Sequence, residues 1–438
     1  MTSTTRTGTQ PPTDDALRAG LRRRWLYVLP AVFITYSLAY LDRANYSFGA
    51  AAGLAATLHI TGEQTSRLAA LFFLGYFLFQ LPGARLARRY SSHRLVAISL
   101  VSWGALAALT GILRSFWMLA VVRFLLGTAE SFIFPAMLLL LTHWFTRQER
   151  SRANAILTLG NPVTVLWMSA ITGYLIQAVG WQRTFIYEGI PSILWAAVWL
   201  VFVRDRPSQA SWLHPSSASD IEAQLALEQT SVPGAASIRI ALLRPDVILL
   251  SIVYFTWSLG VYGFVMWLPT IVHQGSDLSM GRTGLLSAVP YALAIIMMLG
   301  VSYLSDRTQR RRDLIWPFLV AAGLGLLVSF SFASHSFVVA FLGLVIAGGC
   351  MYAPYGSFFA IIPERVPPTA TAEAFACINS AGALGGFFGS YAVGWLQAAT
   401  GNARAGYLLM SMALIASGLL LLRLPEPPQS QLLPGENL

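Results

Sequence analysis

Uninterrupted apolar runs of about 20 residues recur along this chain from Trp25 to Leu422. A helix rises about 1.5 Å per residue, so each run is long enough to cross a bilayer core of about 30 Å. Only 11% of the 438 residues are charged, against about 25% in an ordinary soluble domain. A transmembrane barrel needs alternating polar and apolar residues, whereas these runs are uniformly apolar. The pattern therefore predicts an all-α membrane protein that crosses the bilayer many times.

The runs define twelve candidate spans, which one long polar segment divides into two sets of six. The spans cover residues 26–48, 66–86, 94–113, 116–143, 152–178, 184–203, 247–273, 282–304, 314–333, 336–361, 371–398 and 404–423. We predict two pseudo-symmetric six-helix bundles, at residues 25–203 and 246–423, joined by a cytoplasmic linker at 204–245 that contains a short amphipathic stretch. Residues 1–24 and 424–438 are predicted to be cytoplasmic tails, the first of them disordered.

Arginines determine the expected orientation, because the chain contains no lysine. With the N-terminus inside, twenty arginines flank the inner ends of the spans and five flank the outer ends. Positive charge near span ends favours the cytoplasmic side. We therefore expect both termini to be cytoplasmic, in a plasma membrane of the bacterial inner-membrane type. The same distribution over short loops accounts for the net charge of +10, so no nucleic-acid partner is expected.

Four ionisable residues lie inside two of the predicted spans. Asp42 and Arg43 are near the outer end of the first span, and Arg123 and Glu130 are in the fourth. At about 1.5 Å per residue, Asp42 lies roughly 27 Å from the inner boundary, Arg123 about 10 Å from the outer one and Glu130 about 21 Å from it. Within a boundary some 40 Å thick, Asp42, Arg43 and Arg123 share a level and Glu130 lies near the middle. Arg123 and Glu130 are two helical turns apart and share a face.

These charges indicate a site for an anion and a proton. Ionisable groups within a membrane are functional by default, although ion pairs that only lock the first and fourth spans together are the structural alternative. A guanidinium is always charged and its fork fits a carboxylate, so we assign Arg43 and Arg123 to a small anionic substrate. Burial favours a neutral carboxyl group and a nearby arginine favours its ion. We assign Asp42 and Glu130 to the coupling proton, with Glu130 the more readily protonated.

Neutral polar and aromatic side chains inside the spans are the remaining candidates for substrate contacts. They are Tyr40, Asn45, Tyr76, Asn161, Tyr262, Trp267, Ser357 and Asn379. Each has a structural alternative. Tyrosines also form packing and interfacial belts, Asn161 precedes Pro162 at an expected break in the fifth span, and Asn379 precedes glycines that permit close helix packing.

Basic loops follow both the second and the eighth span. Asp306 and Arg307 precede three arginines at 310–312 after the eighth span, and Arg89 lies in the loop after the second span. Twelve spans in two halves with these loops resemble the major facilitator superfamily. The resemblance implies a cytoplasmic gate formed by Asp306, Arg307 and Arg89. The first loop departs from the family motif, with Arg88 in place of aspartate and Ser91 in place of glycine.

Longer motifs are similar to those of the anion:cation symporter family within that superfamily. They lie at residues 41–45, 123–130, 144–153, 180–191, 205–213 and 262–269. The resemblance covers nearly the whole chain. It implies a carrier of sugar acids, tartrate or aromatic acids, with Asp42, Glu130, Arg43 and Arg123 in the roles assigned above.

The sequence thus predicts a proton-coupled importer of a small organic anion, a sugar acid or hydroxycarboxylate, that works by alternating access as a monomer in the lipid bilayer. An anion exchanger or drug exporter of the same fold, and a non-transporting membrane sensor, are the alternatives. The chain has no phosphate loop, metal-ligand spacing or nucleophile–base pair. We therefore expect no enzyme activity, no metal and no cofactor other than protons.

Overall fold

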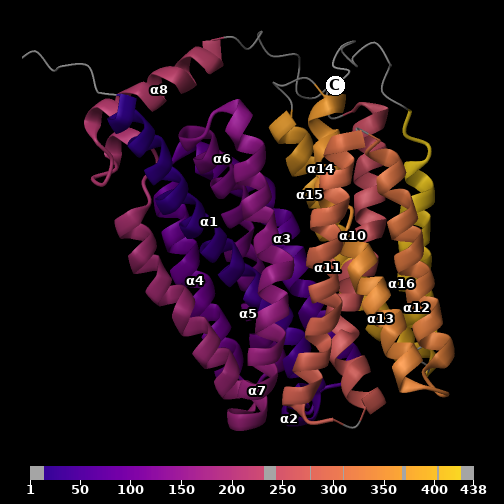
Figure 1. The fold of residues 1–438 in the computed structure, drawn as a ribbon. Coiled ribbons are helices and arrows are strands. Elements are labelled where there is room, and N and C mark those ends of the chain that lie inside the picture. The colour runs from indigo at the N-terminus through magenta and orange to yellow at the C-terminus, as the bar shows by residue number, and fades with distance from the viewer. Residues whose placement is uncertain are drawn as a thin grey trace, which may run out of the picture. The chain divides into compact units, whose positions relative to one another are not determined.

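The computed structural model describes residues 14–230, 243–276, 278–308, 310–366, 371–401 and 404–425. Within these ranges the regular structure is helical (Figure 1), which confirms the predicted all-α fold. The chain forms two compact units. The first comprises Met1–Gly234 with Leu278–Ala288, and the second comprises Ala235–Asp277 with Val289–Leu438.

The first unit is a bundle of long helices with one shorter helix across its end. Its helices are α1 (Asp14–Ala51), α2 (Leu54–Leu58), α3 (Gly62–Arg89), α4 (Ser92–Ile112), α5 (Phe116–Ser131), α6 (Ile133–Trp144), α7 (Arg147–Phe202) and α8 (Pro215–Thr230). Helix α7 consists of two limbs, because the chain reverses its direction at Gly180. The φ of this residue is 79°, a value that favours glycine. These limbs correspond to the fifth and sixth predicted spans. Helix α8 lies at the end of the bundle near which α1 begins (Figure 1).

The second unit is also built from long apolar helices. They are α10 (Pro245–Ser276), α11 (Met280–Thr308), α12 (Trp316–Phe332), α13 (Phe337–Tyr352), α14 (Tyr355–Arg365), α15 (Thr371–Thr400) and α16 (Arg404–Leu421), of which α11 begins in the first unit. Gly385 and Gly389 on α15 pack directly on α10, because an added Cβ would lie 2.2 Å from the carbonyl oxygens of Phe255 and Leu259. The predicted close packing at these glycines is therefore confirmed.

Several helix boundaries differ from those predicted. The fourth span is two helices, since α5 ends at Ser131 and α6 begins at Ile133, where Pro135 supplies no backbone N–H to the preceding turn. The break expected at Asn161 is absent: α7 continues through Pro162, and its non-helical backbone is at Gly180. Helix α1 begins at Asp14, inside the predicted disordered tail, and residues 1–13 lie outside the described residues.

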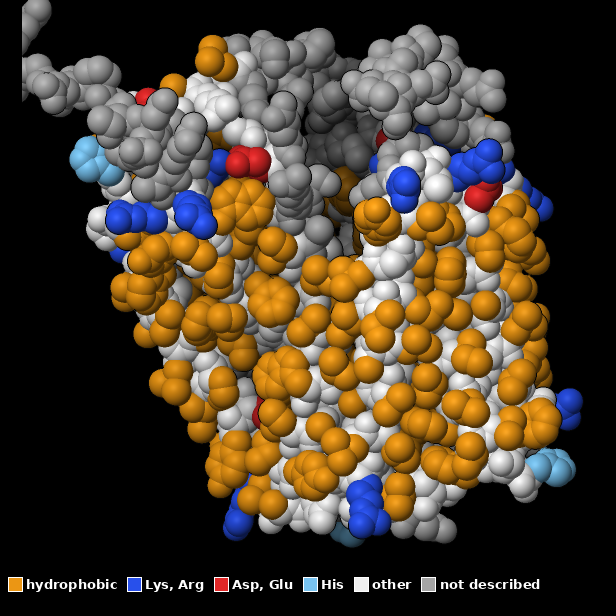
Figure 2. Space-filling view, viewed as in Figure 1, with side chains coloured by type: hydrophobic (Ala, Val, Ile, Leu, Met, Phe, Trp, Pro, Cys, Tyr) orange, Lys and Arg blue, Asp and Glu red, His pale blue; other side chains and the backbone are white. Residues whose placement is uncertain are grey.

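The outer surfaces of these helices suit a lipid environment. Ten segments of the described chain are long and apolar enough to cross a membrane, and the one at Ile156–Phe202 includes both limbs of α7. Figure 2 shows hydrophobic side chains over the middle of the helices and basic ones near their ends. Helix α15, predicted to span, is not among the ten, and its apolar residues are interrupted by Asn379, Ser380 and Ser390.

A glycine crossing holds α3 against α5. A Cβ at Gly127 on α5 would lie 1.9 Å from the carbonyl oxygen of Phe72 on α3. A Cβ at Gly75 on α3 would lie 2.2 Å from the carbonyl oxygen of Phe124 on α5. Real side chains never approach backbone so closely, so only glycine permits this contact. The crossing presents Phe72 to the stretch of α5 that carries the buried charges.

Candidate functional site

A buried ion pair joins α1 to α5 in the first unit. Nη2 of Arg43 lies 2.6 Å from Oε1 of Glu130, and their side chains are 7% and 2% exposed. Apart from this ion pair, neither carboxylate oxygen of Glu130 has a hydrogen-bond partner among the described residues. An arginine and a glutamate lose most of their hydration in such a place, and the attraction between their charges offsets part of that cost.

Aromatic rings surround the guanidinium group of Arg43. Its central carbon lies 4.6 Å from the ring centroid of Tyr76, 5.1 Å from that of Tyr40 and 5.4 Å from that of Phe72. A cation over a ring face is attracted by the negative face of the π-system. Tyr40 and Tyr76 are themselves only 2% and 6% exposed. The rings therefore surround the guanidinium cation in a nearly dry environment. Among the described residues, its acidic partner is Glu130.

Arg123 lies on the same aromatic cluster. Its guanidinium carbon is 4.3 Å from the ring centroid of Tyr46 and 5.1 Å from that of Phe72, and its Nε donates to the carbonyl oxygen of Leu68 at 3.3 Å. The side chain is 3% exposed. Phe72 thus contacts both arginines, and the structure brings the two predicted carboxylate-binding residues to one ring.

The other candidates in the first unit are placed less directly. Asp42 precedes Arg43 on α1, but its side chain lies outside the described residues, so its role stays a prediction. The buried Asn45 contacts Thr172 on α7, with 2.9 Å between Oδ1 and Oγ1. Asn161 is on the first limb of α7, and its Oδ1 is buried without a hydrogen-bond partner among the described residues.

The candidates of the second unit lie on three helices. Tyr262 and Trp267 are on α10, Ser357 is on α14 and Asn379 is on α15. Among the described residues, Nε1 of Trp267 and Oγ of Ser357 are buried without a hydrogen-bond partner. Buried polar atoms normally have partners, and the substrate contacts of these two residues stay predictions.

The predicted gate residues lie at helix ends. Arg89 is the last residue of α3 and is exposed, with its guanidinium carbon 5.8 Å from the ring centroid of Tyr90. Arg307 is exposed near the end of α11, and the side chain of Asp306 lies outside the described residues. Close to this end, Nε of Arg311 lies 2.6 Å from Oε1 of Glu364, an ion pair that the sequence interpretation did not include.

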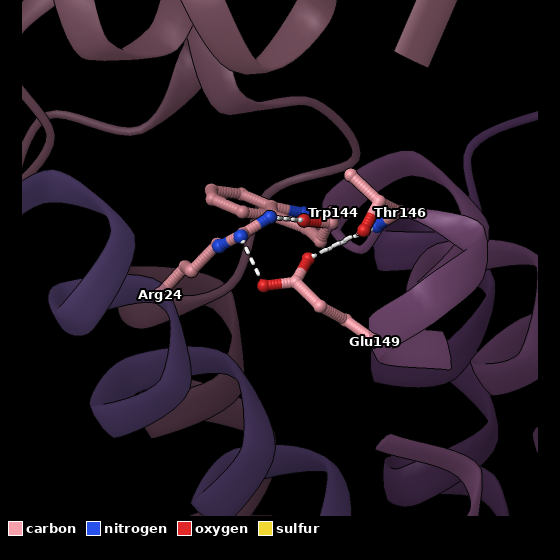
Figure 3. Close-up of polar contacts among 4 residues, drawn as sticks. All are labelled: Arg24, Trp144, Thr146 and Glu149. Atoms are coloured by element: carbon pink, nitrogen blue, oxygen red, sulfur yellow. Dashed lines mark hydrogen bonds and ion pairs between the residues drawn. The ribbon is translucent and has the colours of Figure 1, made fainter. Parts of the chain in front are cut away.

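A second arginine–glutamate pair binds the start of α1 to the connection between α6 and α7 (Figure 3). Arg24 is 2% exposed, and it donates to the carbonyl oxygen of Trp144 at 2.7 Å and to Oε1 of Glu149 at 2.6 Å. Oε2 of Glu149 accepts from the backbone N–H and the hydroxyl of Thr146 at 3.2 and 2.9 Å. Both carboxylate oxygens are therefore bonded, as in a structural pair.

Sequence reasoning missed Phe72 and Tyr46, the rings that receive Arg123. One signal was present for Phe72: it is four residues before Tyr76, so the two rings lie on one face of a helix. The sequence interpretation also assigned no role to Glu188, which lies inside the second limb of α7 and is 5% exposed.

Lipid-length helices that enclose a buried arginine–glutamate pair are typical of polytopic membrane proteins with a functional site between their helices. The family model "Major Facilitator Superfamily" matches residues 32–390. The chain belongs to this superfamily.

Two relatives and one solved structure place the chain further. It is 30% identical over 423 residues to a "Putative tartrate transporter" of Agrobacterium vitis, covering 94% of this chain and 92% of that one. It is 29% identical over 407 residues to a "Quinolone resistance transporter" of Acinetobacter baumannii, covering 89% and 91%. The fold is similar to that of a bacterial homologue of the human lysosomal transporter Spinster in an inward-facing, occupied conformation, with a TM-score of 0.70, 17% identity and coverage of 95% and 96%.

Proposed function

We propose that this transporter imports a small organic anion, a hydroxycarboxylate or sugar acid, together with protons by alternating access. It would act as a monomer in a plasma membrane, with both termini cytoplasmic. The observation that carries the proposal is the ion pair of Arg43 and Glu130, whose carboxylate has no other hydrogen-bond partner among the described residues. The similarity to the Agrobacterium relative named for tartrate supports the class of substrate.

Competition for Arg43 would couple the proton to the anion. While Glu130 is ionised it neutralises Arg43, and no positive charge is left there for a substrate. Protonation of Glu130 removes its negative charge, and the guanidinium fork can then bind a substrate carboxylate. Loss of the proton restores the pair and expels the anion. One proton and one carboxylate are thereby bound and released together.

A second arginine makes the site suitable for a second acidic or hydroxyl group. Arg123 contacts the same Phe72 ring as Arg43, so a dicarboxylate such as tartrate could engage both guanidinium groups. Tyr40 and Tyr76 are proposed to offer their hydroxyls to the substrate. Asp42 is proposed as a further acid of the site, and the roles of Tyr262, Trp267, Ser357 and Asn379 stay those predicted from the sequence.

Uptake by the purified protein in liposomes tests the proposal. With tartrate and gluconate as probes and an inward proton gradient, we expect accumulation above the external concentration that a protonophore abolishes. Uptake that ignores the gradient and requires anion inside the liposome would replace symport with exchange. Absence of both, with folded protein, would contradict transport of these acids.

A second candidate is the export of an aromatic carboxylic acid. The similarity to the quinolone resistance transporter and the rings of Tyr40, Phe72 and Tyr76 around Arg43 favour it. Thermal unfolding with benzoate and with tartrate separates the two candidates. Stabilisation by tartrate alone supports the first, and stabilisation by benzoate alone supports the second.

A further inference from the structure

A second carboxyl group is buried in the first unit, away from the arginines. Glu188 is 5% exposed and lies on the second limb of α7, eight residues after the reversal at Gly180. Thr172 lies eight residues before the same reversal, so the two side chains face each other across the limbs. Helix α4 fixes this limb, because a Cβ on Gly189 would lie 2.5 Å from the carbonyl oxygen of Gly104.

Glu188 belongs to a chain of buried polar groups that reaches α1. Oγ1 of Thr172 lies 2.7 Å from Oε1 of Glu188 and 2.9 Å from Oδ1 of Asn45. Thr172 and Asn45 are both 1% exposed. Asn45 follows Arg43 by two residues on α1. The chain therefore leads from the helix that carries the Arg43–Glu130 pair to a separate acid.

The protons in this chain can be counted. The Thr172 hydroxyl has one proton and two oxygen neighbours, and it can donate to one of them only. A protonated Glu188 supplies the missing proton: its O–H donates to Thr172 Oγ1, which donates to Asn45 Oδ1. A rotated Asn45 amide would also supply a proton, but it would leave an ionised carboxylate buried without a counter-charge, which is far more costly than a neutral one.

No described positive charge compensates Glu188. Among the described residues it forms no ion pair, and its Oε2 has no hydrogen-bond partner. Helix α4 has no charged residue between Arg94 and Arg114. Within three residues of Asn45 on α1, the charged or titratable groups are Arg43, which pairs with Glu130, Asp42, whose side chain is not described, and Tyr46, which donates to the carbonyl oxygen of Thr65. Between Thr172 and Glu188 on α7 they are Tyr174, Arg183 and Tyr187, which are exposed.

We propose that Glu188 is a further proton-binding site of the first unit: it is protonated in this conformation and contributes one of the coupled protons. The coupling part rests on the proposed function, whereas the protonation does not. Without this proton, the Glu188 carboxylate could only accept a hydrogen bond from Thr172. The single hydroxyl proton of Thr172 would then no longer be donated to Asn45. The site is thus connected to α1 by bonds that a proton makes or breaks.

Infrared spectroscopy of the purified protein in lipid nanodiscs, without substrate, tests the protonation. A protonated carboxylic acid has a carbonyl-stretch band that a carboxylate and an amide lack at that position. We expect Glu188→Gln, which keeps a donor to Thr172, to lose one such band. The matched control Glu63→Gln, at a partly exposed residue paired with Arg67, should keep it. Thr172→Val should shift the band, because it removes the acceptor of the Glu188 proton. Identical spectra for the wild type and Glu188→Gln would overturn the proposal.

The ratio of protons to tartrate moved in liposomes tests the coupling. We expect Glu188→Gln to move one proton fewer per tartrate while its uptake still follows the gradient through Glu130. An unchanged ratio would overturn the coupling role. If the wild type accumulates no tartrate, the proposed function fails, and the infrared result still decides whether Glu188 carries a proton.

Discussion

Two arginine–glutamate pairs join different helices in the described part of the first unit, and their surroundings differ. In the pair of Arg24 and Glu149, both carboxylate oxygens are bonded, and the arginine also donates to a backbone carbonyl. In the pair of Arg43 and Glu130, the ion-pair distance is the same 2.6 Å, but the carboxylate has no other hydrogen-bond partner among the described residues and the arginine is surrounded by rings.

We interpret the first as a structural pair and propose that the second is exchangeable. Extra hydrogen bonds offset the desolvation of a buried carboxylate and make its ionised form the only stable one. A carboxylate without further hydrogen bonds loses less when its paired arginine binds another anion. The ion-pair distance therefore does not distinguish the two pairs, whereas the further hydrogen bonds of the carboxylate do.

The largest expected effect comes from neutralising the two glutamates in turn. Glu130→Gln should abolish gradient-driven accumulation of tartrate in liposomes, because no proton is then exchanged at Arg43, while anion exchange continues. Glu149→Gln should keep gradient-driven accumulation per folded molecule. Equal loss of accumulation and exchange in Glu130→Gln would remove its assigned role.

Breaking the structural pair should chiefly affect stability. Arg24→Met leaves Glu149 without its cation, and we expect a loss of about 3 kcal/mol, at the lower end for buried pairs because Glu149 is 28% exposed. Denaturant unfolding in detergent measures this loss. Arg23→Met, at the exposed neighbouring residue, is the matched control and should change stability little. A loss of unfolding free energy no larger than that of Arg23→Met would show that the pair is dispensable.

The crossing of α3 and α5 should be sensitive to a single methyl group. Gly127→Ala places a Cβ against the carbonyl oxygen of Phe72, so the helices must separate, at a cost of about 1–3 kcal/mol. Gly62→Ala, where an added Cβ meets nothing within 4 Å, should change stability by less than about 0.5 kcal/mol. Thermal unfolding compares them, and equal midpoints would contradict the close crossing.

The smallest expected effect is on affinity. Arg123→Lys keeps the charge but removes the planar fork, so we expect tartrate to bind about tenfold more weakly, or about 1.4 kcal/mol. Arg114→Lys, at an exposed residue, should bind as the wild type does. Titration calorimetry makes the comparison. Normal affinity in Arg123→Lys would refute bidentate binding there.

The fold and the charged residues could be predicted from the sequence for the same reason. Long apolar runs have one stable arrangement in a bilayer, and charges inside them are conspicuous. The depth of the residues in the membrane could not show which charges form ion pairs. Arg123 shares a helix face with Glu130, yet the described ion pair of Glu130 is with Arg43. That choice depends on how α1, α3 and α5 rotate and cross. Gly75 and Gly127 set the crossing of α3 and α5 through backbone contacts.

Glu188 illustrates a second limit. It lies four residues inside the predicted sixth span, where a glutamate is usually interpreted as a residue at the membrane–water interface. The reversal at Gly180 carries the limb back beside Thr172 and encloses the side chain. The burial of Glu188 depends on the positive φ of Gly180, and the spacing of the apolar residues does not indicate this backbone conformation.

The number of protons taken up when tartrate binds tests the central claim most directly. Calorimetric titrations in buffers of different ionisation enthalpy give this number for the wild type and for Glu130→Gln. Because binding of the anion and of the proton to Glu130 favour each other, the wild type should take up protons on binding and bind more tightly as the pH falls. Glu130→Gln should take up one proton fewer. Equal proton uptake by the two proteins would contradict competition between the substrate and Glu130 for Arg43.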